Sequence, residues 1–231
     1  MIRKSRSGDF WLIDSDTHIS AWCEQHGKLG HDTNMLPLIL PHIPVGGTVV
    51  DAGSYIGDHT ASYLERVGPT GRVLAFEPMK EAHDCLRLNC PHAFCFRAAL
   101  SDHIGTCRVI PADDNNFGTA RIADEDFNCV VNSVDTVPML TIDSLELLDR
   151  LDYCKLDTEG TELRILKGGV KTVKKFRPVM VIEIHQSALK AAGTSPEELL
   201  AFIKGLNYDV QNIYPRQEMG GPQWDALCLP L

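Results

Sequence analysis

The 231-residue sequence lacks several features that would place it in a familiar functional class. No apolar run approaches the length of a membrane span, and the basic first residues are not followed by the apolar core of a secretory signal. An excess of positive charge is also missing, because the formal net charge is −9 at pH 7. We therefore expect neither a membrane span nor a nucleic acid partner, since a protein that follows a phosphate backbone usually carries the opposite charge.

The eight cysteines include no CxxC pair. Cys85, Cys90 and Cys95 lie near two histidines, but their spacing is not that of a known zinc site. We interpret them as small buried apolar residues. Free thiols in a chain without an export signal favour a reducing compartment, so we expect a cytoplasmic protein.

The stretch VVDAGSYIGDHT (49–60) contains two glycines but neither of the common phosphate-binding signatures. A nicotinamide enzyme requires GxGxxG at such a place, and a nucleoside triphosphatase requires GxxxxGK[ST]. Asp51 instead ends the apolar run, and its charge would repel a pyrophosphate. Gly53 and Gly57 would permit close approach of a ligand to the backbone. The pattern favours a cationic ligand without phosphate, such as S-adenosylmethionine, and an ordinary tight turn is the alternative.

Strand-like and helix-like segments alternate after Thr48, which predicts a Rossmann-like, doubly wound α/β fold. We expect a mainly parallel seven-stranded sheet with one antiparallel strand near the C-terminus, preceded by an N-terminal helical segment. The predicted strands are 48–53, 72–78, 93–100, 153–160, 177–185, 208–214 and 224–230, the last two joined by a turn at 220–221. The predicted helices are 57–67, 79–89, 141–150, 162–176 with a break at Gly168-Gly169, and 195–207.

Three acidic residues end strands of this predicted sheet: Asp51, Glu77 and Asp157. Open α/β sheets bind ligands outside the carboxyl ends of their strands, so these side chains point to one site. A single carboxylate such as Glu77 can accept both hydrogen bonds from a ribose diol. His59, in the first turn of the helix after the glycines, is expected on the surface.

From Val49 to His185 the sequence resembles the FkbM-type methyltransferases of the class I S-adenosylmethionine-dependent fold. The resemblance implies a methyltransferase domain over 46–231. The residue pattern itself predicts 1–45 as a lid or substrate segment and 101–137 as an irregular, strand-rich excursion. Members of this family are O-methyltransferases of sugars and of polyketide-type natural products. Ser54-Tyr55 replaces the usual Ala-Asn, and Thr158 stands where an aliphatic residue is common. The matching blocks are VVDAGSYIGDHT, GPTGRVLAFEP, AALSDHIG, TIDSL, CKLDTEGTELRILKGG and RPVMVIEIH.

The resemblance also implies a set of cofactor-binding residues. Glu77 and Pro78 would lie at the ribose, Ser101 and Asp102 beside the adenine, and Asp157 near the methyl group. The methionine moiety would lie among Asp51, Gly53, Ser54, Tyr55 and Gly57.

Transfer of a methyl group to a sugar hydroxyl requires removal of a proton, so a base or a metal ion is expected. The candidate catalytic residues are Asp157, Glu159 and His185. His185 has the intrinsic pKa range of a general base, with Glu183 as its partner, and a purely structural His185–Glu183 pair is the alternative. A divalent ion such as Mg²⁺, held by Asp157, Glu159 and His185, is the other route.

We therefore expect an S-adenosylmethionine-dependent O-methyltransferase that acts on a sugar, a glycan or a polyketide-type small molecule. One alternative is a binding module that holds S-adenosylmethionine without catalysis. Another is a methyltransferase that acts on protein. The sequence does not determine the oligomeric state, for which a homodimer is the commonest case.

Overall fold

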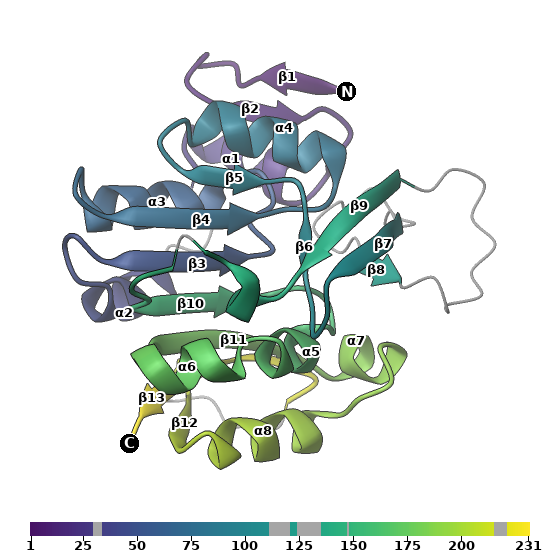
Figure 1. Cartoon of the computed structure of the whole chain (residues 1–231). Helices are drawn as coiled ribbons and strands as arrows, with labels where there is room; N and C mark the ends of the chain where they lie inside the picture. Colours follow the sequence, from purple (N-terminus) through teal and green to yellow (C-terminus); the bar gives the residue numbers. More distant parts are fainter. Residues whose placement is uncertain (30–33, 111–120, 124–134, 147, 215–220) are drawn as a thin grey trace.

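The computed structural model has a central seven-stranded sheet (Figure 1). The structure describes residues 1–29, 34–110, 121–123, 135–146, 148–214 and 221–231. Six of the strands run in one direction and β13 runs against both of its neighbours, which confirms the predicted sheet. The strands are β3 (Thr48–Ala52), β4 (Arg72–Phe76), β5 (Phe94–Phe96), β10 (Tyr153–Leu156), β11 (Val179–His185), β12 (Tyr208–Asn212) and β13 (Gln223–Pro230).

The direction in which the chain fills this sheet reverses beside β3. The spatial order is β12-β13-β11-β10-β3-β4-β5, so the chain runs from β3 to β5 on one side and returns to β10 and β11 on the other. Asp51 and Lys155 are register partners across the β3–β10 pair. Ligands of open α/β sheets bind at such a reversal, outside the carboxyl ends of the strands. The topology therefore places the candidate site just beyond Ala52 and Leu156.

Helices cover both faces of the sheet because successive strand residues face opposite apolar layers. Val50 packs in the layer that holds α5, α6 and α8, whereas Val49 packs in the layer of α2 and α3. Leu86 of α4 packs on Ala75 of β4. Within the described ranges, no helix is both long enough and apolar enough to cross a bilayer. The helices are α2 (Leu36–Ile39), α3 (Asp58–Val67), α4 (Lys80–Asn89), α5 (Glu162–Lys167), α6 (Val170–Phe176), α7 (Gln186–Ala191) and α8 (Pro196–Gly205).

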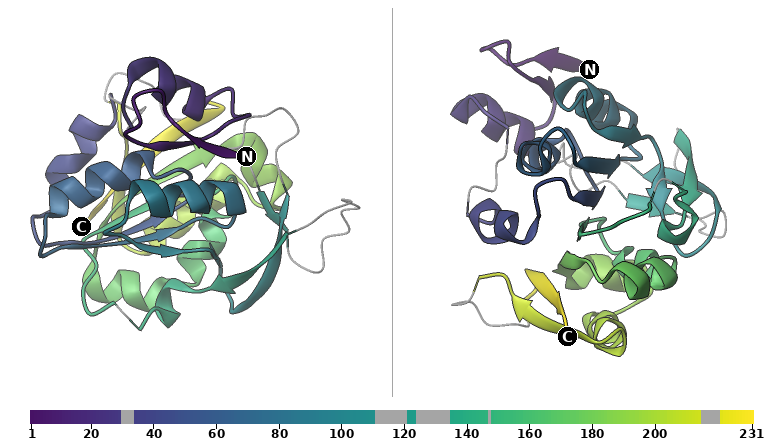
Figure 2. Two further views of the ribbon diagram at one scale, coloured as in Figure 1. Left: turned by 90° about the horizontal axis from the view of Figure 1, so that it is seen from above. Right: turned by 60° about the vertical axis from the view of Figure 1, so that its left-hand side comes forward.

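The N-terminal segment contains the expected helices and, in addition, a β-hairpin that was not predicted. The hairpin packs on α4, where the side chain of Asn89 accepts from the N–H of Trp11 (2.6 Å) and donates to its C=O (2.9 Å). The hairpin lies at the opposite end of the molecule from β12 (Figure 1, Figure 2). Its elements are β1 (Ile2–Lys4), β2 (Trp11–Ile13), α1 (Ile19–His26) and, after α2, the 3-10 helix η1 (Leu40–His42).

The excursion after residue 100 contributes three strands of a separate four-stranded sheet, the side sheet. Residues 111–120 and 124–134 of it lie outside the described ranges. The side sheet projects from the edge where the parallel strands end (Figure 1, Figure 2). Ala99 and Leu100 pair with Met139 and Leu140, so the excursion begins and ends side by side. In the order β6-β9-β7-β8, its strands are β6 (Ala99–Leu100), β9 (Asp135–Leu140), β7 (Gly105–Ile110) and β8 (Arg121–Ala123).

Two predicted elements were wrong. The helix expected over 141–150 is only the 3-10 turn η3 (Ile142–Ser144), and the other described residues of that range are not helical. Both carboxylate oxygens of Asp143 accept backbone N–H groups at the start of α6, from Lys171 (3.1 Å) and Thr172 (2.8 Å), so this segment caps another helix instead. The strand expected over 93–100 is divided between β5 in the central sheet and β6 in the side sheet.

Candidate active site

A cavity opens where β3, β4 and β10 end. Its outline contains about 790 Å³ of space not filled by protein atoms, which includes open solvent. Ile19 of α1 and Ile122 of β8 reach it, so the N-terminal segment and the side sheet both supply walls. The remaining wall comprises Ala52, Gly53, Tyr55, Asp58, His59, Phe76, Glu77, Pro78, Ala98, Ala99, Leu100, Lys155, Asp157, Thr158, Glu159 and Thr161.

Glu77 lies on the cavity wall just after β4, with 6% of its surface exposed. Its carboxylate is held by the backbone, because Tyr55 N–H donates to Oε2 (3.0 Å) and Met79 N–H donates to Oε1 (2.7 Å). Burial raises the pKa of Glu77 to about 7, against these two donors, which lower it. Each oxygen keeps a further lone pair, so the ionised side chain can still accept hydrogen bonds from a diol.

The sequence resemblance implies that Glu77 binds the ribose of S-adenosylmethionine, and on that basis the affinity for S-adenosylhomocysteine is expected to fall as the pH drops from 8 to 6. A hydroxyl binds a carboxylate more strongly than a carboxylic acid, so protonation of Glu77 below its pKa of about 7 competes with binding. The dissociation constant should rise by up to about tenfold per pH unit below that pKa and be constant above it. Isothermal titration calorimetry between pH 5.5 and 8.5 measures the profile. Glu77→Gln is the control, with weaker and pH-independent binding, and a flat wild-type profile would contradict the role of Glu77.

The loop between β3 and α3 is tied to the N-terminal segment through Tyr55. Its O–H donates to Asp16 Oδ2 (2.8 Å), which also accepts the N–H of Ser20 (2.6 Å) in α1. Burial and the Asp16 charge hold the pKa of Tyr55 far above its ordinary value, so the phenol remains a donor. This contact holds the first turn of α1, and with it Ile19, over the cavity.

Gly53 and Gly57 both have left-handed backbone conformations, with φ of 79° and 90°. A Cβ at Gly53 would lie 1.7 Å from the carbonyl oxygen of Asp157, and one at Gly57 would lie 2.7 Å from the sulfur of Cys90. The space that a side chain would need is therefore filled by protein at both positions. Gly53 lines the cavity and Gly57 does not.

Charged side chains are buried at the strand reversal itself. Lys155 is 5% exposed, and its Nζ donates to Asp157 Oδ2 (3.0 Å) and to the C=O of Gly53 (3.3 Å). Asp51 is fully buried and accepts from Thr60 Oγ1 (2.6 Å) without lining the cavity. Burial raises the pKa of Asp51 to about 6, although the Lys155 charge opposes this. For Asp157 burial also favours the neutral acid, but the Lys155 charge, together with hydrogen bonds to Lys155 and Glu183, outweighs it and lowers the pKa.

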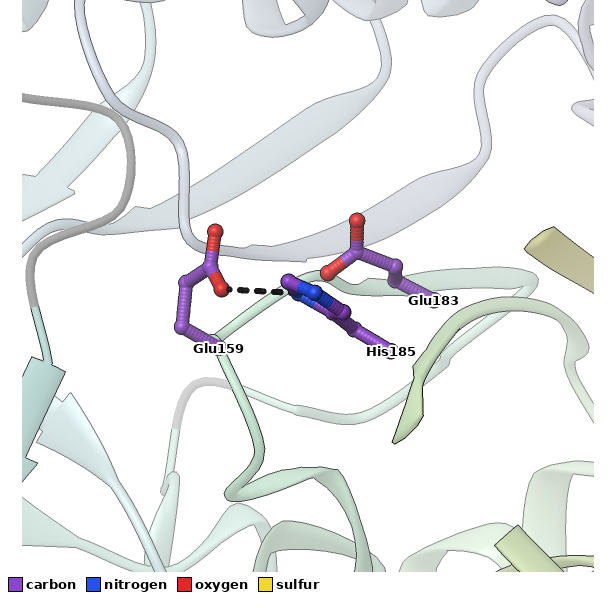
Figure 3. A group of neighbouring side chains, drawn as sticks. All are labelled: Glu159, Glu183 and His185. Carbon is purple, nitrogen blue, oxygen red and sulfur yellow. Dashed lines mark hydrogen bonds and ion pairs between the residues drawn. The ribbon is translucent and has the colours of Figure 1, made fainter. Parts of the chain in front are cut away.

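Glu159, Glu183 and His185 form a second group beside the cavity, the Glu159–Glu183–His185 cluster (Figure 3). One oxygen or nitrogen atom from each lies within 4.8 Å of the others. His185 Nδ1 is 3.2 Å from Glu159 Oε2, and its Nε2 is 3.1 Å from Ser187 Oγ. The structure thus brings together two of the three predicted catalytic residues and adds Glu183 to them.

Glu183 is a buried acid of this cluster. It is 9% exposed, and its Oε1 accepts from Gln223 Nε2 (2.7 Å). Burial, followed by the negative charges of Asp157 and Glu159, raises its pKa to about 10. The third predicted catalytic residue, Asp157, is paired with Lys155 and lies on the cavity wall.

Five predicted cofactor residues do not line the cavity: Asp51 and Gly57, described above, and Ser54, Ser101 and Asp102. Ser54 Oγ donates to the C=O of Asp51 (2.8 Å). Ser101 is fully buried and donates to Asp102 Oδ1 (3.2 Å), which in turn pairs with Arg164 (3.1 Å). The wall in this region is made by the residues just before them, Ala98, Ala99 and Leu100.

Two residues of the cavity wall were missed or misplaced by the sequence analysis. Lys155 was not singled out, although a single lysine inside the apolar strand YCKL, two residues before an aspartate, is a signal of a buried ion pair. His59 was expected on the surface, which was wrong, because it is 5% exposed and lines the cavity. Its ring packs edge-on to that of Tyr63, one helical turn later, with 6.1 Å between centroids. Tyr63 is fully buried, and a residue four positions earlier lies on the same face of a helix. The spacing of His59 and Tyr63 was therefore the sequence signal that could have placed His59 on the buried face of α3.

Residues 51–210 match the methyltransferase FkbM domain. The match covers more than half of the chain, from the end of β3 through β4, β10 and β11, and includes every residue that lines the cavity except Ile19. The chain therefore belongs to the FkbM family of methyltransferases, as the resemblance of its sequence blocks had implied.

Two relatives are informative about this family membership. The chain is 27% identical over 164 residues to methyltransferase sdnD of Sordaria araneosa, which covers 56% of this chain and 62% of that protein. It is 25% identical over 181 residues to the hexuronic acid methyltransferase AglP of Haloferax volcanii, in an alignment that covers 74% of this chain and 67% of that protein. The chain thus spans about two thirds of the length of each relative.

Solved structures of methyltransferases share the fold. A methyltransferase FkbM from Methylobacillus flagellatus superposes with a TM-score of 0.52 at 17% identity, over 79% of this chain and 43% of that one. A TehB-like S-adenosylmethionine-dependent methyltransferase from Corynebacterium glutamicum gives 0.51 at 10% identity, over 90% and 91%. These similarities confirm the Rossmann-like methyltransferase fold.

Proposed function

We propose that this chain transfers a methyl group from S-adenosylmethionine to a hydroxyl group of a sugar or glycan. The observation that carries the proposal is the buried Glu77 carboxylate on the wall of a cavity at the strand reversal, in a chain of the FkbM family. A sugar acceptor is supported by the relative AglP, which is a hexuronic acid methyltransferase. A polyketide-type acceptor is the second candidate, drawn from the sequence resemblance.

The cavity wall fits the parts of S-adenosylmethionine. Glu77, with Pro78 beside it, would bind the ribose diol, and Gly53 and Tyr55 would border the methionine moiety. The apolar surface of Ala98, Ala99 and Leu100 would cover the adenine, with Ser101 and Asp102 directly behind it. Asp51, Ser54 and Gly57 would support this site from inside the protein, since they shape the loop without lining the cavity.

The acceptor would lie at the other end of the cavity, beside Asp157 and Glu159. S-adenosylmethionine supplies the methyl group on a sulfonium, and its transfer to a hydroxyl oxygen releases the hydroxyl proton. Removal of that proton falls to the acidic end of the cavity, where Glu159 contacts His185. Ile19, from the segment 1–45, and Ile122, from the excursion 101–137, would border the acceptor, which supports a substrate role for these two segments.

The charge and the thiols support the same assignment. A net charge of −9 favours a small acceptor over a nucleic acid. The seven cysteines in the described ranges are free thiols, which supports a reducing location such as the cytoplasm.

The test is methyl transfer from deuterium-labelled S-adenosylmethionine to a panel of hexosides, hexuronic acid glycosides and hydroxylated polyketides, followed by mass spectrometry. We expect a labelled sugar, and Glu77→Ala should lower the affinity for S-adenosylhomocysteine by at least about tenfold because the diol loses its acceptor. Glu65→Gln, on the exposed face of α3, is the control. Binding of S-adenosylhomocysteine without transfer to any acceptor would support a binding module, and a labelled protein would support the protein methyltransferase.

A further inference from the structure

We propose that Glu159, Glu183 and His185 together bind one divalent transition-metal cation at the acceptor end of the cavity. His185 Nδ1 and Glu159 Oε2 are 3.2 Å apart. Two ligands that each lie about 2.1 Å from one ion, at an angle near 100°, have this separation. An atom of Glu183 completes the group within 4.8 Å, so small side-chain rotations bring all three to one ion.

The two ligands from β11 are oriented by partners on their far atoms. His185 Nε2 contacts Ser187 Oγ (3.1 Å), which leaves Nδ1 toward the cluster. Gln223 Nε2 donates to Glu183 Oε1 (2.7 Å) and fixes the plane of that carboxylate. Metal-binding histidines normally make such a hydrogen bond with the second ring nitrogen, and ligating carboxylates are held in the same way.

Glu183 supplies an observation that is independent of the clustering. Its Oε2 is buried and accepts no hydrogen bond from an N–H or O–H donor in the part of the chain that the structure describes, and the residue is 9% exposed. The carboxyl instead interacts with the Asp157 carboxylate, a contact between two acids that needs a shared proton or a cation. A buried carboxylate oxygen without such a donor is costly and needs an explanation. Figure 3 shows a carboxylate oxygen of Glu183 directed toward His185, and a cation would lie between these two side chains.

The donor set indicates which cation. Two carboxylates and one imidazole suit Mn²⁺, Fe²⁺ or Zn²⁺, whereas Mg²⁺ prefers oxygen ligands alone. The structure therefore changes the ligand set expected from sequence, with Glu183 in place of Asp157, which is held by Lys155. Glu159 is also part of the cavity wall, so the cation would border the acceptor. Its role there rests on the proposed function: a bound cation lowers the pKa of an acceptor hydroxyl, whose proton leaves to water.

The test is titration of the full chain with Mn²⁺, after removal of metals with EDTA, by isothermal titration calorimetry and by electron paramagnetic resonance. We expect one Mn²⁺ per chain in the absence of S-adenosylmethionine. Glu183→Gln and His185→Ala should weaken the affinity by at least about 100-fold, and Ser187→Ala by about tenfold because it only orients a ligand. Glu65→Gln should bind as the wild type does.

His185→Ala keeps the test decisive if Glu183→Gln fails to fold, because the His185 side chain is 27% exposed and its removal leaves no large cavity. A wild-type chain that binds no Mn²⁺, or a His185→Ala chain that binds it normally, overturns the metal site. Titration of the same samples with S-adenosylhomocysteine separates the two proposals. Mn²⁺ binding without S-adenosylhomocysteine binding would leave the metal site standing and reject the methyltransferase. Full methyl transfer in EDTA, with no Mn²⁺ binding, would do the reverse and assign proton removal to His185.

Discussion

Lys155→Met is expected to lower the free energy of unfolding by about 3–5 kcal/mol at pH 7.5, the usual cost of removing one partner from a buried ion pair. The Lys155 side chain is 6% exposed, and its ammonium balances Asp51 and Asp157. The Asp157 side chain is 40% exposed, so water can screen it once the lysine is gone. Asp51 is fully buried, and most of the loss should come from its unbalanced charge.

The dependence of this loss on pH distinguishes it from simple loss of packing. Burial already raises the pKa of Asp51 to about 6, and removal of Lys155 raises it further because the opposing cation is gone. Relative to the wild type, the variant should therefore lose most stability above pH 6. It should lose much less at pH 5, where Asp51 is neutral whether or not Lys155 is present. Urea unfolding at pH 5.0 and 7.5 measures the difference.

Two further variants serve as controls for Lys155→Met. Lys190→Met removes a lysine from the exposed face of α7 and should change the free energy of unfolding by less than about 0.5 kcal/mol. The double variant Lys155→Met/Asp51→Asn should recover part of the loss, since it removes the unbalanced charge. Equal losses at the two pH values, or no recovery in the double variant, would show that Lys155 acts through packing.

Gly53→Ala is expected to cost at least about 3 kcal/mol of unfolding free energy and to weaken S-adenosylhomocysteine binding more than about 100-fold. The added Cβ would lie 1.7 Å from the carbonyl oxygen of Asp157, so the β3–α3 loop and the end of β10 must separate. That movement also displaces the acceptor for Lys155 Nζ at the C=O of Gly53. Both the cavity wall and the buried charges are therefore disturbed together.

Gly193→Ala is a matched control for Gly53→Ala. Gly193 has a φ of 78°, against 79° for Gly53, and nothing lies within 4 Å of its Cβ position. It therefore reports the cost of the left-handed conformation alone, about 1–2 kcal/mol. Urea unfolding and calorimetry compare the two variants. If both variants lost a similar free energy of unfolding, the close contact with Asp157 would be relieved at little energetic cost. The interpretation of Gly53 as a packing glycine would then be wrong.

The parts of the fold that follow from local chemistry were predictable from sequence. The strands β3, β4, β10 and β11 are largely apolar runs with charged residues at or just after their ends, and α8 is capped by Ser195, whose hydroxyl accepts the N–H of Glu198 (3.2 Å). The segment 141–150 was mispredicted because its conformation is determined by contacts with residues distant in sequence. Asp143 binds the start of α6, which no local pattern reveals.

The residues of the candidate site likewise include some that were predictable from sequence and some that were not. Glu77 and Asp157 could be placed at the cavity because they follow strands whose carboxyl ends share one edge. The Glu159–Glu183–His185 cluster could be predicted only in part, since Gln223 and the orientation of Glu183 depend on the β11–β13 pairing. Ile19 and Ile122 carry no signal at all, because an isolated isoleucine is equally suited to any apolar surface.

The pairing of β6 with β9 bears on how chains of this kind diverge. Because Leu100 of β6 and Leu140 of β9 are register partners, the excursion between them begins and ends side by side. The cost of closing such a loop rises only slowly with its length, so insertions and deletions between these strands leave the rest of the sheet in place. Under the proposed function, Ile122 makes this tolerant segment part of the acceptor wall while Glu77 and Gly53 belong to another stretch of chain. Under that function, sequence changes confined to the excursion between β6 and β9 can alter which acceptor binds, while the methyl-donor site stays unchanged.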